Sequence, residues 1–460
     1  MIEIEIKSIA DVLEAKLIGD GNISVSEISI DSRNPVKNGL FFALKGENFD
    51  AHHYLKNAIE QGNVAIVVEQ PSEANFPQLI VSDTRLALGK LAKWLKARIN
   101  PRTLVITGSS GKTSVKEMTA AILQHLVQDK DEVLFTKGNF NNDIGVPLTL
   151  LRLTPKHKYA VVELGANHQG EIAYTTTLAE PDVALINNVA SAHLEGFGSI
   201  EGVARAKGEI FRSLKHDGIA LINLDCEYLK FWQQEIGLHQ IQSFSLHSSK
   251  ADFYAENIKI TPERADFLLC TPQGKIQIQL PYLGEHNVAN ALAATALAMN
   301  AGATLIQVKA GLEQKSQVKG RLFPIQPCEN LLLLDDTYNA NPNSMQAAIA
   351  VLQKYQAFRI FVVGDMGELG ENSQSCHVQV GETAKRANLD LVVSFGSQSA
   401  VISQICGGKH FENKQTLSDF VIDIIEEKLE QKRQVVLLAK ASRSMQAEDV
   451  INTLRDYFIC

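Results

Sequence analysis

A short glycine-containing segment, VITGSSGKTSVKEM at residues 105–118, constrains this chain more than any other. Its G-x-x-G-K-T core runs from Gly108 to Thr113 and matches the second half of a phosphate-binding loop. The first glycine of the full Walker A pattern is absent, because Ile106 stands in its place. A strand-like run, TLVIT, precedes the loop, and apolar residues at helical spacing follow it. This order predicts a strand, a phosphate-binding turn and a helix.

The loop makes a specific chemical prediction about its ligand. Glycines allow backbone N–H groups to approach phosphate oxygens, and the helix N-terminus adds a favourable dipole. The Lys112 ammonium would neutralise β- and γ-phosphate oxygens, and the Thr113 hydroxyl would ligate Mg²⁺. A chance G-K-T in a surface turn is the alternative, but such a turn requires neither the strand nor the helix. We therefore expect ATP to be bound by Gly108, Ser109, Ser110, Gly111, Lys112, Thr113 and Ser114.

The chain of 460 residues is too long for one hydrophobic core. From about residue 103, apolar runs alternate with helical patterns, which is typical of βαβ units with parallel strands. A β-rich stretch at 252–283 interrupts this pattern and is interpreted as a hairpin excursion. We expect three α/β domains: a small N-terminal domain at 1–84, a central parallel-sheet domain with the phosphate loop at 85–312, and a Rossmann-like doubly wound domain at 313–460.

Polar side chains stand at the carboxyl ends of the predicted strands. They are Thr107, Glu163, Asn187, Asp336, Asp365 and Lys440. Open parallel sheets bind ligands outside the carboxyl ends of their strands, so two such sheets predict a cleft with one wall from each domain. Glu163 and His193 each follow a buried strand of the sheet that carries the phosphate loop. Alone, a strand-end carboxylate or a single histidine often has no function; their shared position favours a joint metal site.

Lys207 falls on the apolar stripe of a predicted helix, EGVARAKGEIFRSL at 201–214. In one interpretation its ammonium extends past the apolar residues to water. In the other, desolvation lowers the pKa of the amine, which then adds CO₂ and becomes a carbamate able to bind a metal. The sequence leaves both interpretations open.

Composition argues against several classes of partner. A net charge of −8 is unlike that of nucleic-acid-binding proteins and does not favour anionic lipid. No run approaches the roughly 20 apolar residues of a membrane helix, and no signal peptide is expected. The six cysteines form no C-x-x-C pair, which favours reduced thiols in the cytoplasm over disulfides or a zinc site.

Together these motifs resemble the Mur ligase family, the ATP-dependent amino-acid ligases of peptidoglycan precursor synthesis. Its members carry a shortened phosphate loop, a strand-end glutamate, a histidine, a helix lysine and an HNxxNxxAA helix, which starts here at His286. The stretches at 138–151, 163–172 and 335–345 are similar to the member that joins D-alanyl-D-alanine to UDP-N-acetylmuramoyl-tripeptide. One position departs from the family, since Ala441 replaces a glycine and adds a β-carbon to this loop.

The resemblance implies a role for each matched position. The catalytic residues would be Lys112, Glu163, His193, Lys207 and Arg321. The ligands of two Mg²⁺ sites would come from Thr113, Glu163, His193 and a carbamylated Lys207. The nucleotide would contact His286, Asn287, Asn290, Arg321 and Asp336 in addition to the loop. The UDP-linked peptide and the dipeptide would contact Ser32, Arg33, Lys45, Gly46, Asn139, Asn141, Asn142, Asn339 and Asn341.

The resemblance also implies where the γ-phosphoryl group of ATP goes. It would pass to the carboxylate of the UDP-linked peptide, and the amine of the dipeptide would then attack the acyl phosphate, in a cytoplasmic monomer. The alternative is a sister ligase that adds the third residue of the stem peptide, although the DNPR motif of its diaminopimelate-adding form is absent. A P-loop kinase or switch protein would keep the full Walker A spacing, and a non-enzymatic ATP-binding module would not need the metal-site residues.

Overall fold

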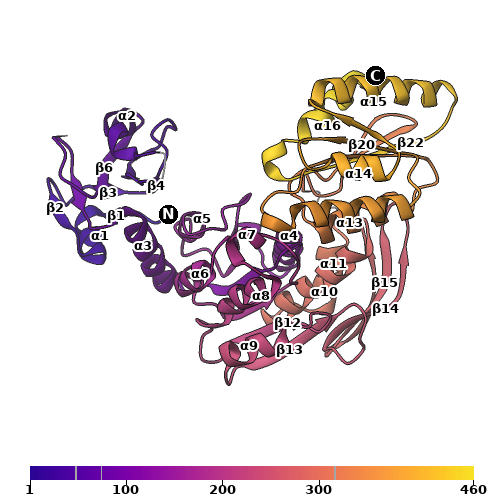
Figure 1. Ribbon diagram of the computed structural model, residues 1–460. Helices are drawn as coiled ribbons and strands as arrows, with labels where there is room; N and C mark the ends of the chain where they lie inside the picture. The colour runs from indigo at the N-terminus through magenta and orange to yellow at the C-terminus, as the bar shows by residue number, and fades with distance from the viewer. Residues whose placement is uncertain (47–48, 74, 315–317, 460) are drawn as a thin grey trace.

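The computed structural model describes residues 1–46, 49–73, 75–314 and 318–459, and it contains three large sheets covered by helices (Figure 1). The first sheet stands away from the third, and both are joined to the central one (Figure 1). The expected three-domain α/β architecture is confirmed.

The first domain has a five-stranded sheet in the order β2-β7-β6-β5-β4. Its strands are β2 (Lys16–Ile18), β4 (Glu27–Ser29), β5 (Gly39–Phe42), β6 (Asn63–Val68) and β7 (Gln78–Ile80). The accompanying elements are β1 (Ile4–Glu5), which pairs with β3 (Ser24–Val25), and the helices α1 (Ile6–Leu13), η1 (Ala51–Tyr54) and α2 (Leu55–Glu60). The long helix α3 (Thr84–Ile99) starts at Asp83, whose carboxylate accepts from Leu86 N at 2.9 Å. Its apolar side chains belong to one core shared by the first and central domains.

The central domain has a nine-stranded sheet in the order β16-β15-β14-β13-β12-β11-β8-β10-β9. Its strands are β8 (Arg102–Thr107), β9 (Val133–Phe135), β10 (Tyr159–Glu163), β11 (Val183–Ile186), β12 (Ile219–Asn223), β13 (Gln240–Ser245), β14 (Phe253–Ile260), β15 (Ala265–Thr271) and β16 (Gly274–Leu280). The last three pair antiparallel, so the β-rich stretch extends the main sheet at its edge instead of leaving it. In the parallel part, Glu163 pairs with Ile106 and Ile186 with Thr107, which brings the strand ends to one edge.

Helices cover both faces of this sheet. One face carries α4 (Lys112–Gln124), α10 (Glu285–Asn300) and α11 (Leu305–Leu312). The other carries α5 (Gly145–Leu150), α6 (Glu171–Ala179), η3 (Glu209–Phe211) and α9 (Leu229–Ile236), and α8 (Ile200–Gly208) packs against α6, η3 and α9. The helix predicted at 201–214 is therefore shorter than expected, because it tightens into a 3₁₀ turn after Gly208.

The third domain has a six-stranded sheet in the order β17-β18-β22-β19-β20-β21, parallel except for β17. Its strands are β17 (Phe323–Cys328), β18 (Leu331–Asp335), β19 (Phe358–Gly364), β20 (Leu391–Phe395), β21 (Lys409–Phe411) and β22 (Val435–Lys440). The helices are α12 (Pro342–Leu352), α13 (Ser373–Arg386) and α14 (Ala400–Ile405) on one face, and α15 (Lys414–Glu430) and α16 (Glu448–Phe458) on the other. Ala441 is fully buried and is not among the described non-glycine residues with positive φ. The backbone at this position therefore accepts a β-carbon in an ordinary conformation.

Two expectations from composition can also be checked. The cysteines Cys226, Cys270, Cys328, Cys376 and Cys406 are free thiols, and Cys460 lies outside the described residues. Across the described ranges, every helix is too short or too polar to cross a membrane.

Candidate active site

The phosphate loop is held in shape by asparagine side chains that follow the neighbouring strand β11. Asn187 Nδ2 donates to the Ser110 carbonyl at 3.0 Å, and Asn188 Oδ1 accepts from the Ser110 backbone N–H at 2.9 Å. The Ser109 backbone N–H donates to the Asn188 carbonyl at 3.1 Å. Because β11 lies beside β8, the residues after one strand reach the loop after the other. These hydrogen bonds within the protein hold the shape of the loop.

Of the two loop glycines, Gly111 is the one where an added β-carbon would meet the closest neighbours. It caps α4 with φ 76° and ψ −6°, a left-handed conformation. A β-carbon there would lie 2.4 Å from Asn290 Oδ1 and 2.6 Å from Asn187 Nδ2. These two amides are hydrogen-bonded to each other at 3.0 Å, and Asn290 Nδ2 donates to Asn287 Oδ1 at 2.9 Å. The asparagines of the HNxxN motif thus support the phosphate loop as well as facing a cavity.

Several of the predicted catalytic side chains meet at a cavity of about 150 Å³. Thr113 Oγ1 donates to Glu163 Oε2 at 3.0 Å, and Asn141 Nδ2 donates to Glu163 Oε1 at 2.8 Å. Glu163 is only 2% exposed, so these two donors satisfy a buried carboxylate. His193 and Lys207 line the same cavity, as the sequence analysis predicts.

Two buried lysines line this cavity. Lys112 Nζ donates to the Gly108 carbonyl at 2.8 Å, and burial lowers the pKa of Lys112, while Glu163 opposes the shift. Lys207 is 3% exposed, and burial together with the charge of Lys112 lowers the pKa of Lys207 well below its ordinary range. Its amine therefore lies in the cavity and not in bulk water, as the desolvated interpretation requires.

His193 occupies the edge of the cavity, at the start of α7 (Leu194–Phe197). Its Nδ1 lies 2.6 Å from Glu368 Oε2 of the third domain, with an approach too bent for an ordinary hydrogen bond. The nearby imidazole holds the pKa of Glu368 below its usual value. This contact joins two domains at a residue that the sequence marks as a metal ligand.

The donor set at the cavity suits a hard cation only in part. Within the described ranges, no group of three or more His, Cys, Asp or Glu side chains is close enough to hold a metal ion. The donors present are Glu163, His193 and the Thr113 hydroxyl, which is hydrogen-bonded to Glu163. Mg²⁺ is commonly held by one or two carboxylates together with substrate phosphates, so this set fits an ion that the substrate helps to bind.

A second cavity of about 310 Å³ adjoins the first and shares Arg321 with it. His286 and Asp336 lie on its walls. Asp336 Oδ1 accepts from Leu322 N at 3.2 Å, and its Oδ2 lies 2.7 Å from Lys440 Nζ. Burial lowers the pKa of His286 to about 4, against the opposing charge of Asp336, so this imidazole is neutral near pH 7.

The third domain supplies the opposite wall, as the prediction of a cleft between two sheets requires. The Arg321 guanidinium stacks over the Tyr338 ring with 4.2 Å between its carbon and the ring centroid. Tyr338, Asn339 and Asn341 line the smaller cavity. Asn341 is also the N-cap of α12, where its Oδ1 accepts from Ser344 N at 2.9 Å. The Asn341 side-chain oxygen is thus already used in capping α12.

Some predicted site residues are not brought to either cavity. The four residues of the first domain are Ser32, Arg33, Lys45 and Gly46. Arg33 is paired with Asp31 at 2.8 Å and points to solvent. In the segment GNFNN, Asn141 lines the smaller cavity. Asn139 is exposed, and Asn142 Oδ1 accepts from Gly145 N at 2.8 Å, at the first residue of α5.

Asp365, predicted from its strand end, likewise has a structural task. Its carboxylate accepts backbone N–H groups of Ser397, Gln398 and Ser399 at 2.8–3.0 Å. Three residues that contact the loop or the smaller cavity were not predicted individually: Asn188, Tyr338 and Glu368. Asn188 directly follows a strand end and could have been found by that rule; the other two depend on how the domains dock.

Comparison with known proteins agrees with this geometry. Residues 106–298 match the family described as "Mur ligase middle domain", and residues 320–443 match "Mur ligase, glutamate ligase domain". Residues 24–96 match "Mur ligase family, catalytic domain".

Individual relatives cover the whole chain. A protein of Haemophilus influenzae named "UDP-N-acetylmuramoyl-tripeptide--D-alanyl-D-alanine ligase" is 61% identical over 100% of both chains, and one of the same name from Escherichia coli is 50% identical over 100% of both. Among solved structures, MurF from Acinetobacter baumannii superposes with a TM-score of 0.93 at 37% identity over 99% of both chains. MurF ligase from Thermotoga maritima in complex with ADP has a TM-score of 0.82 at 26% identity, covering 94% of this chain and 98% of that one. The chain belongs to the Mur ligase family.

Proposed function

We propose that this chain is an ATP-dependent ligase that joins D-alanyl-D-alanine to UDP-N-acetylmuramoyl-tripeptide, acting as a monomer in the cytoplasm. The observation that carries the proposal is the smaller cavity, where Lys112 and Glu163 of the phosphate-loop domain face Arg321 of the third domain. The relatives named for this reaction support it, since they match the chain over its full length.

ATP binds across the two adjoining cavities. The Lys112 ammonium and the backbone N–H groups of Gly111, Lys112 and Thr113 take the phosphates, because the N–H groups of Ser109 and Ser110 are already bonded to Asn188. The larger cavity takes the nucleoside, between His286 and Asp336. Arg321 lines both cavities and so reaches the phosphates from the third domain. The Thermotoga maritima neighbour, solved with ADP, supports nucleotide binding by this fold.

Two Mg²⁺ sites would be formed by Thr113, Glu163 and His193, with a carbamate on Lys207 as a further ligand. The desolvated Lys207 amine is suited to this modification: its lone pair bonds to the carbon of CO₂, and one proton leaves to solvent. Bound Mg²⁺ screens the repulsion between the triphosphate and the acceptor carboxylate.

Amide formation from a carboxylate and an amine is uphill at neutral pH, so the carboxylate must first be activated. An oxygen of the peptide carboxylate attacks the γ-phosphorus, and ADP leaves. The free amine of the dipeptide then attacks the acyl carbon, loses a proton, and inorganic phosphate leaves. Lys112 and Arg321 place positive charge beside the phosphoryl group during its transfer. Tyr338, which lines the cavity from the third domain, limits the access of water to the acyl phosphate.

The three domains divide the substrates. The domain at 1–84 holds the UDP portion through Ser32, Arg33, Lys45 and Gly46. The domain at 85–312 holds ATP and presents Asn139, Asn141 and Asn142 to the peptide. The domain at 313–460 closes the cavity and presents Asn339 and Asn341 to the dipeptide.

Phosphate release from ATP tests this proposal, with UDP-N-acetylmuramoyl-tripeptide present and D-alanyl-D-alanine either added or omitted. We expect release that needs both substrates, with a UDP-pentapeptide identified by mass. Lys112→Ala should abolish it, whereas Lys156→Ala on an exposed loop should not. Turnover only with the UDP-dipeptide and a single amino acid would assign the chain to the sister reaction instead.

A further inference from the structure

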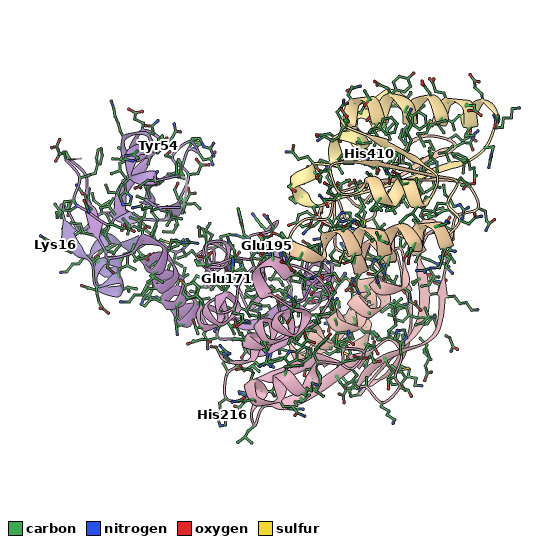
Figure 2. All side chains as sticks on the ribbon, in the orientation of Figure 1. Lys16, Tyr54, Glu171, Glu195, His216 and His410 are labelled. Atoms are coloured by element: carbon green, nitrogen blue, oxygen red, sulfur yellow. The ribbon has the colours of Figure 1, made fainter. Side chains whose placement is uncertain are left out.

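A contact between domains at the edge of the catalytic cavity has no task in the reaction as described. His193 Nδ1 and Glu368 Oε2 are 2.6 Å apart. The Glu195 backbone N–H also donates to the Glu368 carbonyl at 3.3 Å. Glu195 lies where the central domain meets the third domain (Figure 2). Both the carboxylate and the backbone of Glu368 therefore contact the segment that starts at His193.

The backbone at this contact is strained on both sides. His193 has a φ of 54° and Glu368 a φ of 61°, both in the left-handed region. A non-glycine residue there costs about 1–2 kcal/mol relative to an ordinary helical conformation. Such strain persists only where surrounding structure requires it, and it is found preferentially at functional sites. Two strained residues that face each other across a domain boundary indicate that the direction of their side chains matters.

The short distance determines where the imidazole carries its hydrogen. If Nδ1 were unprotonated, its lone pair would face a carboxylate oxygen at 2.6 Å, which is repulsive. Nδ1 must therefore bear the hydrogen, even though the approach is bent. A neutral imidazole has one N–H, so Nε2 keeps its lone pair. Histidines that bind metals have this arrangement, with the other ring nitrogen held by a carboxylate or carbonyl.

We propose that Glu368 is a positioning residue for the metal site: from the third domain it fixes His193 as the Nδ1–H tautomer and leaves Nε2 as the ligand. The inference rests on the proposed function, because it takes His193 as a ligand of Mg²⁺. It adds a coupling between domains. His193 belongs to the phosphate-loop domain, whereas Glu368 lies between β19 and η4 (Gly370–Asn372) of the third domain. The ligand is completely oriented only when the third domain is docked.

The tautomer can be measured without metal or substrate. In protein labelled with ¹⁵N in its histidine rings, two-bond ¹H–¹⁵N correlation spectra distinguish Nδ1–H from Nε2–H, and His193→Gln assigns the signal. We expect the Nδ1–H form in the wild type and a mixture of forms in Glu368→Ala. Glu368→Gln keeps an acceptor oxygen and should restore much of the wild-type pattern. Glu371→Ala is the matched control, because Glu371 is an exposed carboxylate of the same loop.

The second readout is the affinity for Mn²⁺, a paramagnetic substitute for Mg²⁺, measured by electron paramagnetic resonance with a non-hydrolysable ATP analogue. Loss of a carboxylate that orients a metal ligand weakens binding by roughly 10- to 100-fold. We expect about a tenfold loss in Glu368→Ala and none in Glu371→Ala. An unchanged tautomer in Glu368→Ala, or equal Mn²⁺ affinity in the two alanine variants, overturns the proposal. If the wild type forms no UDP-pentapeptide but both readouts change as expected, the proposed function fails and the positioning role stands.

Discussion

Replacing Gly111 by alanine perturbs the phosphate loop at a point where the structure determines the free-energy cost. The new β-carbon would lie 2.4 Å from Asn290 Oδ1, whereas ordinary contacts begin at about 3.4 Å, so the amide must move by about 1 Å. That movement breaks the 3.0 Å hydrogen bond between Asn187 and Asn290. Leaving a buried partner unsatisfied costs about 1–3 kcal/mol. The left-handed backbone adds about 1–2 kcal/mol for any residue other than glycine.

Gly170 provides a matched control that separates these two contributions. It caps α6 with φ 89° and ψ −21°, close to the conformation of Gly111, and nothing lies within 4 Å of a β-carbon placed there. Gly170→Ala therefore carries the backbone cost without the collision. The difference between the two variants isolates the displaced asparagine pair.

The assay is calorimetric titration with a non-hydrolysable ATP analogue. A loss of about 1–3 kcal/mol corresponds to a Kd raised about 5- to 150-fold, since each 1.4 kcal/mol is tenfold. We expect this change in Gly111→Ala and a change below about twofold in Gly170→Ala. Equal nucleotide affinity in the two alanine variants would falsify the claim that the asparagine pair holds the loop in its binding shape.

Three further predictions follow from buried polar groups. Lys207→Ala should lower ligase activity by at least about 100-fold with partial recovery on adding a short carboxylic acid; full activity in the phosphate-release assay would exclude the carbamate. Burial lowers the pKa of Lys96 to about 8, whereas the value in the unfolded chain is 10.5. Between these two pH values the unfolded chain binds more protons than the folded one, so the free energy of unfolding rises with pH. Relative to Lys96→Met, the wild type should gain up to roughly 3 kcal/mol over this range. A melting-temperature difference that stays constant with pH would contradict this. Tyr355→Phe removes the 2.9 Å hydrogen bond to the Pro262 carbonyl between the third and central domains, and should destabilise the protein by about 0.5–1.5 kcal/mol in thermal unfolding. A melting temperature equal to that of the wild type would show that this bond does not stabilise the docked domains.

The strands of the central sheet were predictable where they are buried on both faces. The continuous apolar run TLVIT before the phosphate loop predicted β8, because parallel strands between two helical layers need apolar side chains on both sides. The strand β9 has three residues, and β13 begins with the exposed residues Gln240 and Ile241. Neither has a periodic signal, so their pairing is visible only in the folded sheet.

Some residues of the site were predictable from the sequence and others were not. Lys112, Thr113 and Glu163 were predictable together, because parallel strands end at one edge and the phosphate loop leaves from that edge. Asn142 and Asn341 were predicted to face substrate, yet each side-chain oxygen accepts a backbone N–H at a helix start: Asn142 from Gly145 of α5, and Asn341 as the N-cap of α12. Asparagine is favoured at helix starts and at ligand sites for the same reason, its side-chain oxygen, so the sequence does not separate the two roles.

The position of the first domain explains why the proposed reaction needs a long substrate to carry the acceptor carboxylate. The third domain contributes side chains to both cavities, whereas the first contributes none of their lining residues and is joined through α3 (Figure 1). A substrate anchored near Ser32 or Lys45 must therefore extend its reactive carboxylate to Glu163 across the span of α3. A nucleotide-sugar that carries a tripeptide has this length, and a free amino acid does not. On the proposed function, shortening the stem peptide should impair delivery of the carboxylate to the phosphate loop even when the UDP end still binds, so turnover should fall more than affinity.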